Sequence, residues 1–214
     1  MNKKICLVLM AVILTASYAH AQLNFGLRAG FNMTNMNESS DGLSPDLDML
    51  AGFQVGVVAD YAVSNNFSIQ PAVLFATQGA RWEIPAMDIG FQTPAINTTL
   101  RLNYIQVPIN AIYRVDFGFG GLLLQAGPYL GYALSGKATA RMAGISNSED
   151  IEFGNGDEEL RRLDFGVGFG AGLQLGAVQA VLGYNIGLAN LSNANNVTLN
   201  NNGLALTLTY IFGR

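Results

Sequence analysis

The stretch LDFGVGFGAGLQLG, residues 163–176, has a glycine at every second position through its centre. Gly166, Gly168, Gly170 and Gly172 alternate there with apolar or small residues. The segment also matches, loosely, the G-x-G-x-x-G/A fingerprint of a dinucleotide-binding loop, which requires a strand, a tight turn and then a helix. No helical period follows these glycines, and the next residues begin another alternating run. We therefore predict a β-strand with one apolar face and one face that consists mostly of glycines and so carries few side chains.

The same period of two recurs in seven other segments. In LNFGLRAGFN, residues 23–32, apolar residues take the odd positions and polar or small residues take the even ones. A helix would show a period near 3.6, which none of these segments has. The other alternating segments span residues 53–63, 67–78, 105–114, 124–134, 182–188 and 204–212. Eight strands are predicted.

Composition indicates where these strands lie. Half of the chain is hydrophobic and only 12% is charged, yet after Tyr18 no apolar run approaches the about 20 residues that a membrane helix needs. A transmembrane β-barrel reconciles the two observations, because its hydrophobic residues are spread by alternation instead of forming runs. A soluble domain with so few charges would be unusual.

The first 21 residues have the features of a signal peptide. A basic start with Lys3 and Lys4 precedes an apolar stretch, and Ala19-His20-Ala21 is a small-residue cleavage site. We expect residues 1–21 to be removed, which leaves residues 22–214 as one barrel domain in the outer membrane. The only cysteine, Cys6, and the only histidine, His20, leave with this segment.

The residue types that remain after residues 1–21 are removed exclude several kinds of chemistry. Without thiol or imidazole, the mature chain has no cysteine or histidine nucleophile, no histidine general base and no usual zinc or haem ligands. Nine basic and fifteen acidic residues remain, a net charge near −6 that would repel nucleic acid. We expect no enzyme activity, no cofactor and no metal. An acidic run, residues 149–159, is predicted to be a solvated loop.

The connections indicate the topology. Short turns are expected at residues 64–66, 116–121 and 176–177, and long polar connections at residues 33–49, 83–99, 138–162 and 190–203. This alternation is typical of outer-membrane barrels, with the short turns in the periplasm and the long loops outside. Aromatic residues near strand ends fit interfacial girdles: Phe25, Tyr61, Phe67, Tyr113, Phe117, Tyr210 and Phe212. The fold class is therefore predicted to be all-β, an eight-stranded antiparallel up-and-down transmembrane β-barrel.

Five segments carry a family resemblance: GLRAGFNMTNM, FSIQPAVLFATQGARWE, LNYIQVPINAIYR, AGPYLGY and LDFGVGFGAGLQL. In this order the chain resembles the PorT-like outer-membrane β-barrel family of Bacteroidetes, small barrels of the OmpX and OmpA kind. The resemblance covers essentially all of the chain after residue 21 and implies an eight-stranded barrel. One member gives the family its name through a role in a protein-secretion system; most members have no known activity, so the name does not transfer that role to this chain. The last strand, with Tyr210 and Phe212, resembles the signal read by the barrel-assembly machinery, although Gly213 and Arg214 follow it.

An eight-stranded barrel is just wide enough inside to be filled by side chains. Arg28 and Asp60, which face inward on neighbouring strands, are expected to form an ion pair there. The expected lumen network consists of Arg28, Gln54, Asp60, Gln70, Gln106, Asn110, Arg114 and Gln125. The network either fills the lumen or surrounds a ligand site or ion path.

Small residues are expected on the opposite wall. The predicted glycine wall consists of Gly166, Gly168, Gly170, Gly172, Gly183 and Gly187. We interpret it as a device that makes room for the long polar side chains across the lumen. The alternative is that the bare wall lines a cavity for a ligand or water.

Two function classes remain open. The barrel is either a structural or adhesive protein whose loops face the outside, or an accessory component of a secretion or envelope-assembly complex. A soluble carrier barrel of the lipocalin kind is a third, weaker alternative. The expected partners are outer-membrane lipid, the barrel-assembly machinery during biogenesis and, in the accessory role, another envelope or secretion component.

Overall fold

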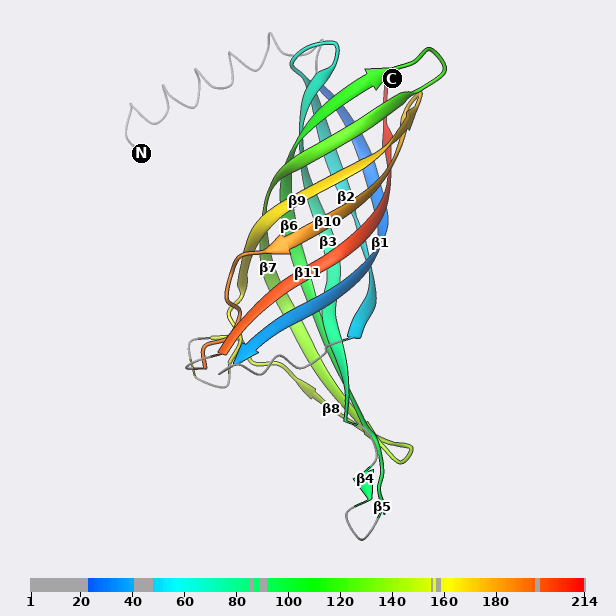
Figure 1. Ribbon diagram of the computed structural model, residues 1–214. Helices are drawn as coiled ribbons and strands as arrows, with labels where there is room; N and C mark the ends of the chain where they lie inside the picture. Colours follow the sequence, from blue (N-terminus) through cyan, green and yellow to red (C-terminus); the bar gives the residue numbers. More distant parts are fainter. Residues whose placement is uncertain are drawn as a thin grey trace, which may run out of the picture.

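A computed structural model describes residues 23–40, 48–84, 87–88, 92–154, 156, 159–194 and 197–213 (Figure 1). The predicted signal peptide, residues 1–21, lies outside this range, so its cleavage stays a prediction. Within the described residues, no helix has both the length and the hydrophobicity to cross a membrane.

Eight long strands make up most of the fold. They are β1 (Leu23–Ser40), β2 (Asp48–Ala62), β3 (Phe67–Ile84), β6 (Ile96–Asp116), β7 (Gly121–Met142), β9 (Leu163–Leu175), β10 (Val178–Gly187) and β11 (Val197–Ile211). A shorter strand, β8 (Ile145–Asp150), pairs with β7, and β4 (Met87–Asp88) pairs with β5 (Gln92–Thr93) in a separate two-stranded sheet.

The main sheet curls into a barrel (Figure 1). Its strand order is β6-β3-β2-β1-β11-β10-β9-β7-β8, and β6 also pairs with β7, so the two sides of the sheet meet. Every one of these pairings is antiparallel. The predicted all-β, antiparallel, up-and-down architecture is confirmed. The sheet has nine strands instead of eight, because β8 pairs with β7 over Lys137–Met142, beyond the part of β7 that pairs with β9.

The two ends of the barrel differ. At the turn end, short turns join β2 to β3, β6 to β7 and β9 to β10, and both Leu23 and Gly213 lie there (Figure 1). In the two-residue turn between β9 and β10, Gly176 has a φ of +58°, a conformation that favours glycine. The other connections lie at the loop end. All seven aromatic residues predicted to be interfacial belong to the turn end, where they flank its strand ends and turns.

The strands continue further toward the loop end than the sequence predicted. β1 runs to Ser40, β7 to Met142, and β6 and β11 already begin at Ile96 and Val197. The predicted long connections were therefore too long. In β6 the period of two is inverted there, with Leu100 and Leu102 buried and Arg101 exposed, and in β11 the residues before Gly203 are polar and show no apolar period.

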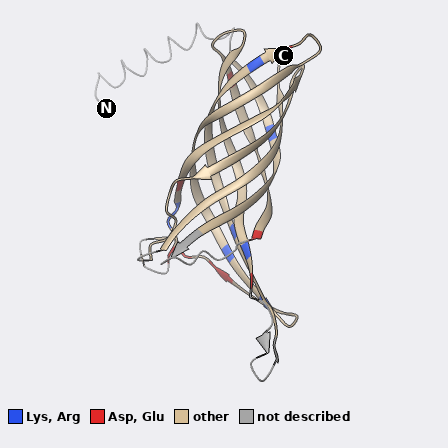
Figure 2. Ribbon diagram, in the orientation of Figure 1, with Lys and Arg blue, Asp and Glu red and all other residues tan. Residues whose placement is uncertain are grey.

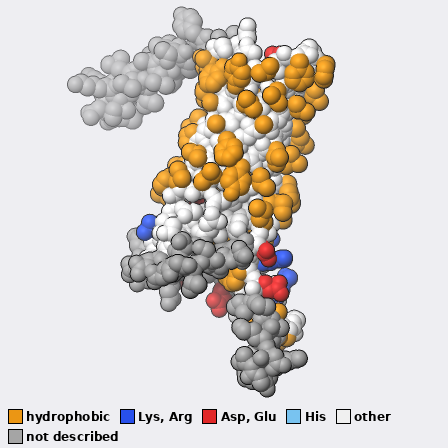
Figure 3. Space-filling model, viewed as in Figure 1, with side chains coloured by type: hydrophobic (Ala, Val, Ile, Leu, Met, Phe, Trp, Pro, Cys, Tyr) orange, Lys and Arg blue, Asp and Glu red, His pale blue; other side chains and the backbone are white. Residues whose placement is uncertain are grey.

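The outer surface of the barrel is apolar (Figure 3). Side chains at alternate positions, such as Val57, Phe169 and Leu206, are about half exposed, while their neighbours point inward. Buried polar and charged residues occupy the interior. This is the reverse of a soluble carrier barrel with an apolar lumen, and it excludes that alternative. It fits a barrel whose outer face contacts lipid.

Apolar layers also lie inside the barrel, at different heights. Near the turn end, Ile112, Leu123 and Val181 pack together. At the loop end, a larger cluster is built around Met36, Leu102 and buried Tyr104. Partly buried side chains from the connection between β7 and β9, including Ile151 and Phe153, pack against this second cluster. Polar lumen residues lie on both sides of the first layer: Arg114 and Gln179 stand two positions nearer the turn end than Ile112 and Val181 on the same strands.

Candidate functional site: the polar lumen

The predicted lumen residues all lie on the inner face. Gln125 is partly buried, and the other seven are buried: Arg28, Gln54, Asp60, Gln70, Gln106, Asn110 and Arg114. They come from β1, β2, β3, β6 and β7, which the pairing brings around one interior. Arg28, Asp60, Gln70 and Arg114 belong to one hydrogen-bonded network and Gln106 to a second, while Gln54, Asn110 and Gln125 line a small cavity between the two.

The first network is centred on Asp60. Arg114 donates from Nη2 to both carboxylate oxygens of Asp60, at 2.9 and 3.1 Å. The hydroxyl of Ser68 donates to Asp60 Oδ1 at 2.7 Å, and Gln70 Nε2 donates to the same oxygen at 3.3 Å. A buried carboxylate is costly unless it is paired and hydrogen-bonded, and Asp60 is both.

Arg28 joins this network through Gln70. Arg28 Nη2 donates to Gln70 Oε1, and Arg28 Nε donates to Thr209 Oγ1 at 2.9 Å. We expected Arg28 to be the ionic partner of Asp60; at 2.9 Å the structure shows Arg114 in that place. On the other side, Arg114 Nε donates to Gln174 Oε1 at 3.0 Å.

Gln179 completes what we call the arginine network: Arg28, Asp60, Ser68, Gln70, Arg114, Gln174, Gln179 and Thr209. Its Nε2 donates to Gln174, and its Oε1 accepts from Gln70. The members come from seven strands, namely β1, β2, β3, β6, β9, β10 and β11. The arginine network therefore bridges the interior from wall to wall.

A second network, the Asp164 network, lies nearer the loop end. Asn201 Nδ2 donates to Gln78 Oε1 and, at 3.4 Å, to Asp164 Oδ2. The Tyr129 hydroxyl donates to Asp164 Oδ1 at 3.5 Å, and Gln78 Nε2 donates to Gln106 Oε1 at 3.3 Å. This network connects β3, β6, β7, β9 and β11.

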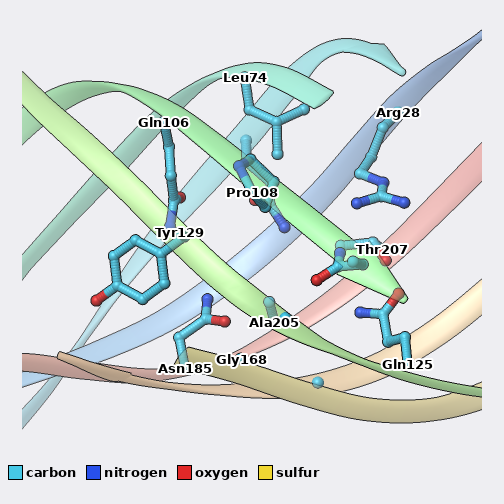
Figure 4. Close-up of a pocket in the computed structure, with 14 residues that line it drawn as sticks. Arg28, Leu74, Gln106, Pro108, Gln125, Tyr129, Gly168, Asn185, Ala205 and Thr207 are labelled. Atoms are coloured by element: carbon cyan, nitrogen blue, oxygen red, sulfur yellow. The ribbon is translucent and has the colours of Figure 1, made fainter. Parts of the chain in front are cut away.

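A cavity of about 40 Å³ lies between the two networks (Figure 4). It is lined by Arg28, Gln106, Gln125 and Asn185 among others, and by Gly168 and Gly183 of the glycine wall. A second cavity of about 10 Å³ borders Asn32 and Asn201. Because a water molecule needs roughly 10–15 Å³ of such volume, the two together accommodate a few waters and no larger ligand.

The cavities contain polar atoms that a water could bind. Within the described residues, Gln125 Oε1 at the larger cavity, and Asn32 Oδ1 and Asn201 Oδ1 at the smaller one, have no hydrogen-bond partner. Buried polar groups usually find a partner in protein or ordered water. The lumen is therefore suited to hold single waters between side chains.

The glycines of the predicted wall differ in their surroundings. A Cβ on Gly172 would lie 2.0 Å from the carbonyl oxygen of Ala180, and one on Gly166 would lie 2.1 Å from that of Ile186. Both contacts are with the backbone of the neighbouring strand. At Gly168 the nearest atom, at 2.4 Å, is the movable Asn185 Oδ1, and at Gly183 nothing lies closer than 3.3 Å. Close approach of strand backbones thus accounts for part of the wall, while Gly168 and Gly183 border the cavity.

The acidic run does not form a site in the part of the chain that the structure describes. Glu149 and Asp150 belong to β8 and are exposed, not in a loop as predicted. Asp150 approaches Lys137 at 3.7 Å. Asp157 and Glu158 lie outside the described residues. Among the described residues, no three histidine, cysteine, aspartate or glutamate side chains are grouped so that they could hold a metal ion.

Several network members were not assigned from the sequence. Three of them stand on the polar face of predicted strands: Gln78, Asp164 and Gln174. Their positions in the apolar–polar alternation were the signal that they face the lumen. Asn201 was placed in a loop, and Gln179 precedes the alternating segment that predicted β10. At the turn end, Tyr210 and Phe212 point outward and their rings meet edge to face, with centroids 5.4 Å apart.

The chain matches one protein family and is similar to several solved structures. Residues 16–193 match the family described as outer membrane protein beta-barrel domain. A comparison with curated proteins finds no match. Similar solved structures include Ail, the attachment invasion locus protein of Yersinia pestis (16% identity, 88% of this chain and 99% of that chain, TM-score 0.39), Neisserial surface protein A (17%, 87% and 96%, 0.43) and the outer membrane protein OprG of Pseudomonas aeruginosa (10%, 89% and 96%, 0.41).

The family match extends over most of the chain, and it agrees with an antiparallel barrel that is apolar outside and polar inside. The chain therefore belongs to the outer membrane protein beta-barrel domain family and is a protein of the outer membrane.

Proposed function

We propose that the protein is a non-enzymatic, non-conducting barrel that spans the outer membrane and presents its loop end to the outside. Eight strands, β1, β2, β3, β6, β7, β9, β10 and β11, form the spanning wall in this proposal, and β8 extends it beyond the membrane. The arginine network carries the proposal, because side chains from seven of these strands meet across the interior. Such a filled lumen leaves no route for solutes.

The way in which the interior carboxylates are held supports the proposed absence of catalysis. Asp60 is bound to Arg114, Ser68 and Gln70, and Asp164 belongs to the separate network of Tyr129 and Asn201. A mechanism with two carboxylates needs both groups at one substrate. Here each carboxylate is occupied by its own hydrogen-bond partners, and the cavity between them admits only waters.

The proposed working part is the loop end. Strands β3, β6 and β7 continue past the other strands, and β8 adds a hairpin there (Figure 1). Its turn, Ala143 and Gly144, has positive φ at both residues, as a type I′ hairpin turn requires. An extension of paired strands of this kind is suited to structural or adhesive contacts outside the cell.

An accessory role in a secretion or envelope-assembly complex is the second candidate, in line with the resemblance to the PorT-like family. One observation favours it. At the turn end, Phe119 is 84% exposed and stacks edge to face on Phe117, with ring centroids 5.3 Å apart. An exposed aromatic pair in a periplasmic turn could contact an envelope partner.

Site-specific photocrosslinking in intact cells distinguishes the two roles. A photoreactive residue replaces Ile145 in the β8 hairpin or Phe119 in the turn, and Leu182 on the lipid-facing wall serves as the matched control. The structural or adhesive role predicts no stoichiometric envelope protein on the Phe119 probe. A stoichiometric crosslink from Phe119, absent from the Leu182 probe, would instead establish the accessory role.

A further inference from the structure

A cleft lined by positive charges lies on the outer face of the loop-end extension. We call it the outer basic cleft; its volume is about 300 Å³, and its lining consists of Leu50, Arg81, Thr99, Arg101, Lys137, Thr139 and Arg141. Four cationic side chains from β3, β6 and β7 thus border one space. No acidic residue belongs to the lining among the residues that the structure describes.

Strand register places these cations on one face. Arg101 of β6 lies directly opposite Lys137 of β7, and Arg81 of β3 lies opposite Thr99, which in turn lies opposite Thr139. Like charges directly opposite each other on paired strands are destabilising. The pair of Arg101 and Lys137 therefore costs stability unless an anion lies between the two side chains.

Anions from the protein itself compensate this charge only partly. Among the described residues, Arg81, Arg101 and Arg141 form no ion pair, and Lys137 meets Asp150 at 3.7 Å with both side chains mostly exposed. Such an exposed pair contributes little. Two other acids flank the cleft: Asp48 lies opposite Arg81 in the register, and Glu83 lies opposite Asn97. The cleft lining keeps a surplus of positive charge.

The height of the cleft relative to the apolar surface suggests its ligand. Lys137 follows Leu134, an exposed apolar residue of the lipid-facing wall, by three residues. Three residues of strand span roughly 10 Å, and less along the membrane normal because barrel strands are tilted. The charged residues of the loop end begin directly below the apolar surface in Figures 2 and 3. This is the depth of lipid headgroups.

We propose that the outer basic cleft binds the phosphate groups of a phosphorylated glycolipid of the outer leaflet, that is, of lipopolysaccharide. Arginine presents a planar fork of donors that matches phosphate oxygens, and three arginines border the cleft. The acyl chains of the same lipid would lie along the apolar wall below. The assignment to the outer leaflet rests on the proposed orientation, with the loop end outside.

Lipid binding is measured on the folded protein in neutral detergent by native mass spectrometry, with a chelator present. Lipopolysaccharide adducts on the wild type are compared with those on the double variant Arg101→Gln/Lys137→Gln. Lys137→Arg is the conservative control, and Arg161→Gln removes a loop-end charge that does not line the cleft. Heat-modifiable gel mobility confirms that each variant is folded.

The double variant is expected to lose about tenfold or more in affinity, since two charge-assisted contacts disappear. The two controls should bind like the wild type, and dephosphorylated lipopolysaccharide should bind neither protein. Competition by inorganic phosphate at low concentration would show that a free anion, and not the lipid, is the ligand. Equal binding by the double variant, or by dephosphorylated lipid, overturns the proposal.

Orientation is tested separately, with Ile145→Cys labelled in intact cells by a membrane-impermeant maleimide. Labelling is expected if the loop end is outside. Absence of labelling, together with loss of binding in the double variant, would refute the proposed orientation and with it the outer leaflet as the source of the lipid. It would leave phosphate recognition by the cleft intact, so the two failures are distinguishable.

Discussion

Arg114 and Asp60 form an ion pair inside the barrel, with 2.9 Å between Nη2 and Oδ1 and side chains that are 4% and 0% exposed. They come from β6 and β2, which are not neighbours in the sheet, since β3 lies between them. Ser68 and Gln70 of β3 donate to the same carboxylate and thereby bridge the gap. The ion pair and these two hydrogen bonds thus connect three adjacent strands on the inner face of the barrel wall.

The energy of this pair is measured by a double-mutant cycle. Removing one partner, by Asp60→Asn or Arg114→Gln, should lower the free energy of unfolding by about 3–5 kcal/mol, because a charge is left buried without its partner. The double variant should lose less than the sum of the two, with a coupling energy of about 0.5–3 kcal/mol. Urea unfolding in lipid vesicles provides the values.

The same cycle with Arg28→Gln serves as the comparison. Arg28 reaches Asp60 through Gln70, so its coupling to Asp60 should be smaller than that of Arg114. Additive losses for Arg114 and Asp60, or a larger coupling for Arg28, would show that the ionic contact is not the one described.

Charge should be tolerated differently on the two faces of the wall. Val57→Arg and Phe169→Arg place a cation on side chains that face outward. Each should cost about 2–4 kcal/mol near the membrane midplane. Gln106→Leu, on the inner face, should cost less, about 0.5–1.5 kcal/mol, through the hydrogen bond it removes. Folding yield and urea midpoints in vesicles test this, and equal costs on both faces would mean that the assignment of faces is wrong.

Glycines of the inner wall should respond to alanine according to what lies beside them. Gly172→Ala places a methyl group 2.0 Å from a backbone oxygen of β10, whereas Gly183→Ala meets no atom closer than 3.3 Å. We expect a loss of about 1–3 kcal/mol for Gly172→Ala and a much smaller effect for Gly183→Ala. Thermal unfolding of both variants in the same detergent compares them directly.

Gly168→Leu tests how full the lumen is. Its side chain must displace the Asn185 amide and enter a cavity of about 40 Å³, which is too small for a leucine side chain. We expect a lower folding yield or a loss of about 1–3 kcal/mol. Unchanged thermal stability would show that the lumen contains enough empty volume for a leucine side chain, and it would favour a ligand cavity.

The barrel should not conduct ions. The arginine network and the Asp164 network cross the lumen at two heights, and the cavities between their side chains measure about 40 and 10 Å³. Purified protein in planar bilayers should therefore give no discrete current steps, while a porin prepared in the same way gives them. Reproducible steps from the folded form, absent after heat unfolding, would contradict the filled lumen.

The alternation of residues by itself determined which face of each strand meets lipid. Val57 and Phe169 were assigned outward, and Gln106 and Gly168 inward, because successive side chains of a strand point to opposite faces whatever the neighbouring strands are. The same alternation was sufficient for the all-β class, and the breaks between alternating segments located the short turns. The sequence pattern underestimated the lengths of β1 and β11 at the loop end, where residues such as Asn201 pair with the neighbouring strand but show no alternation of apolar residues.

Only the tertiary structure decided which inward residues meet. The alternation of side chains places Arg28, Arg114 and Asp60 in one lumen. That Arg114, and not Arg28, forms the ion pair with Asp60 at 2.9 Å depends on the relative heights of β2 and β6. The outer basic cleft arises in the same way, because Arg101 and Lys137 stand 36 positions apart and become neighbours only through the register of β6 and β7. Register and barrel closure depend on contacts between strands that are distant in sequence, and the residue pattern within one strand does not determine those contacts.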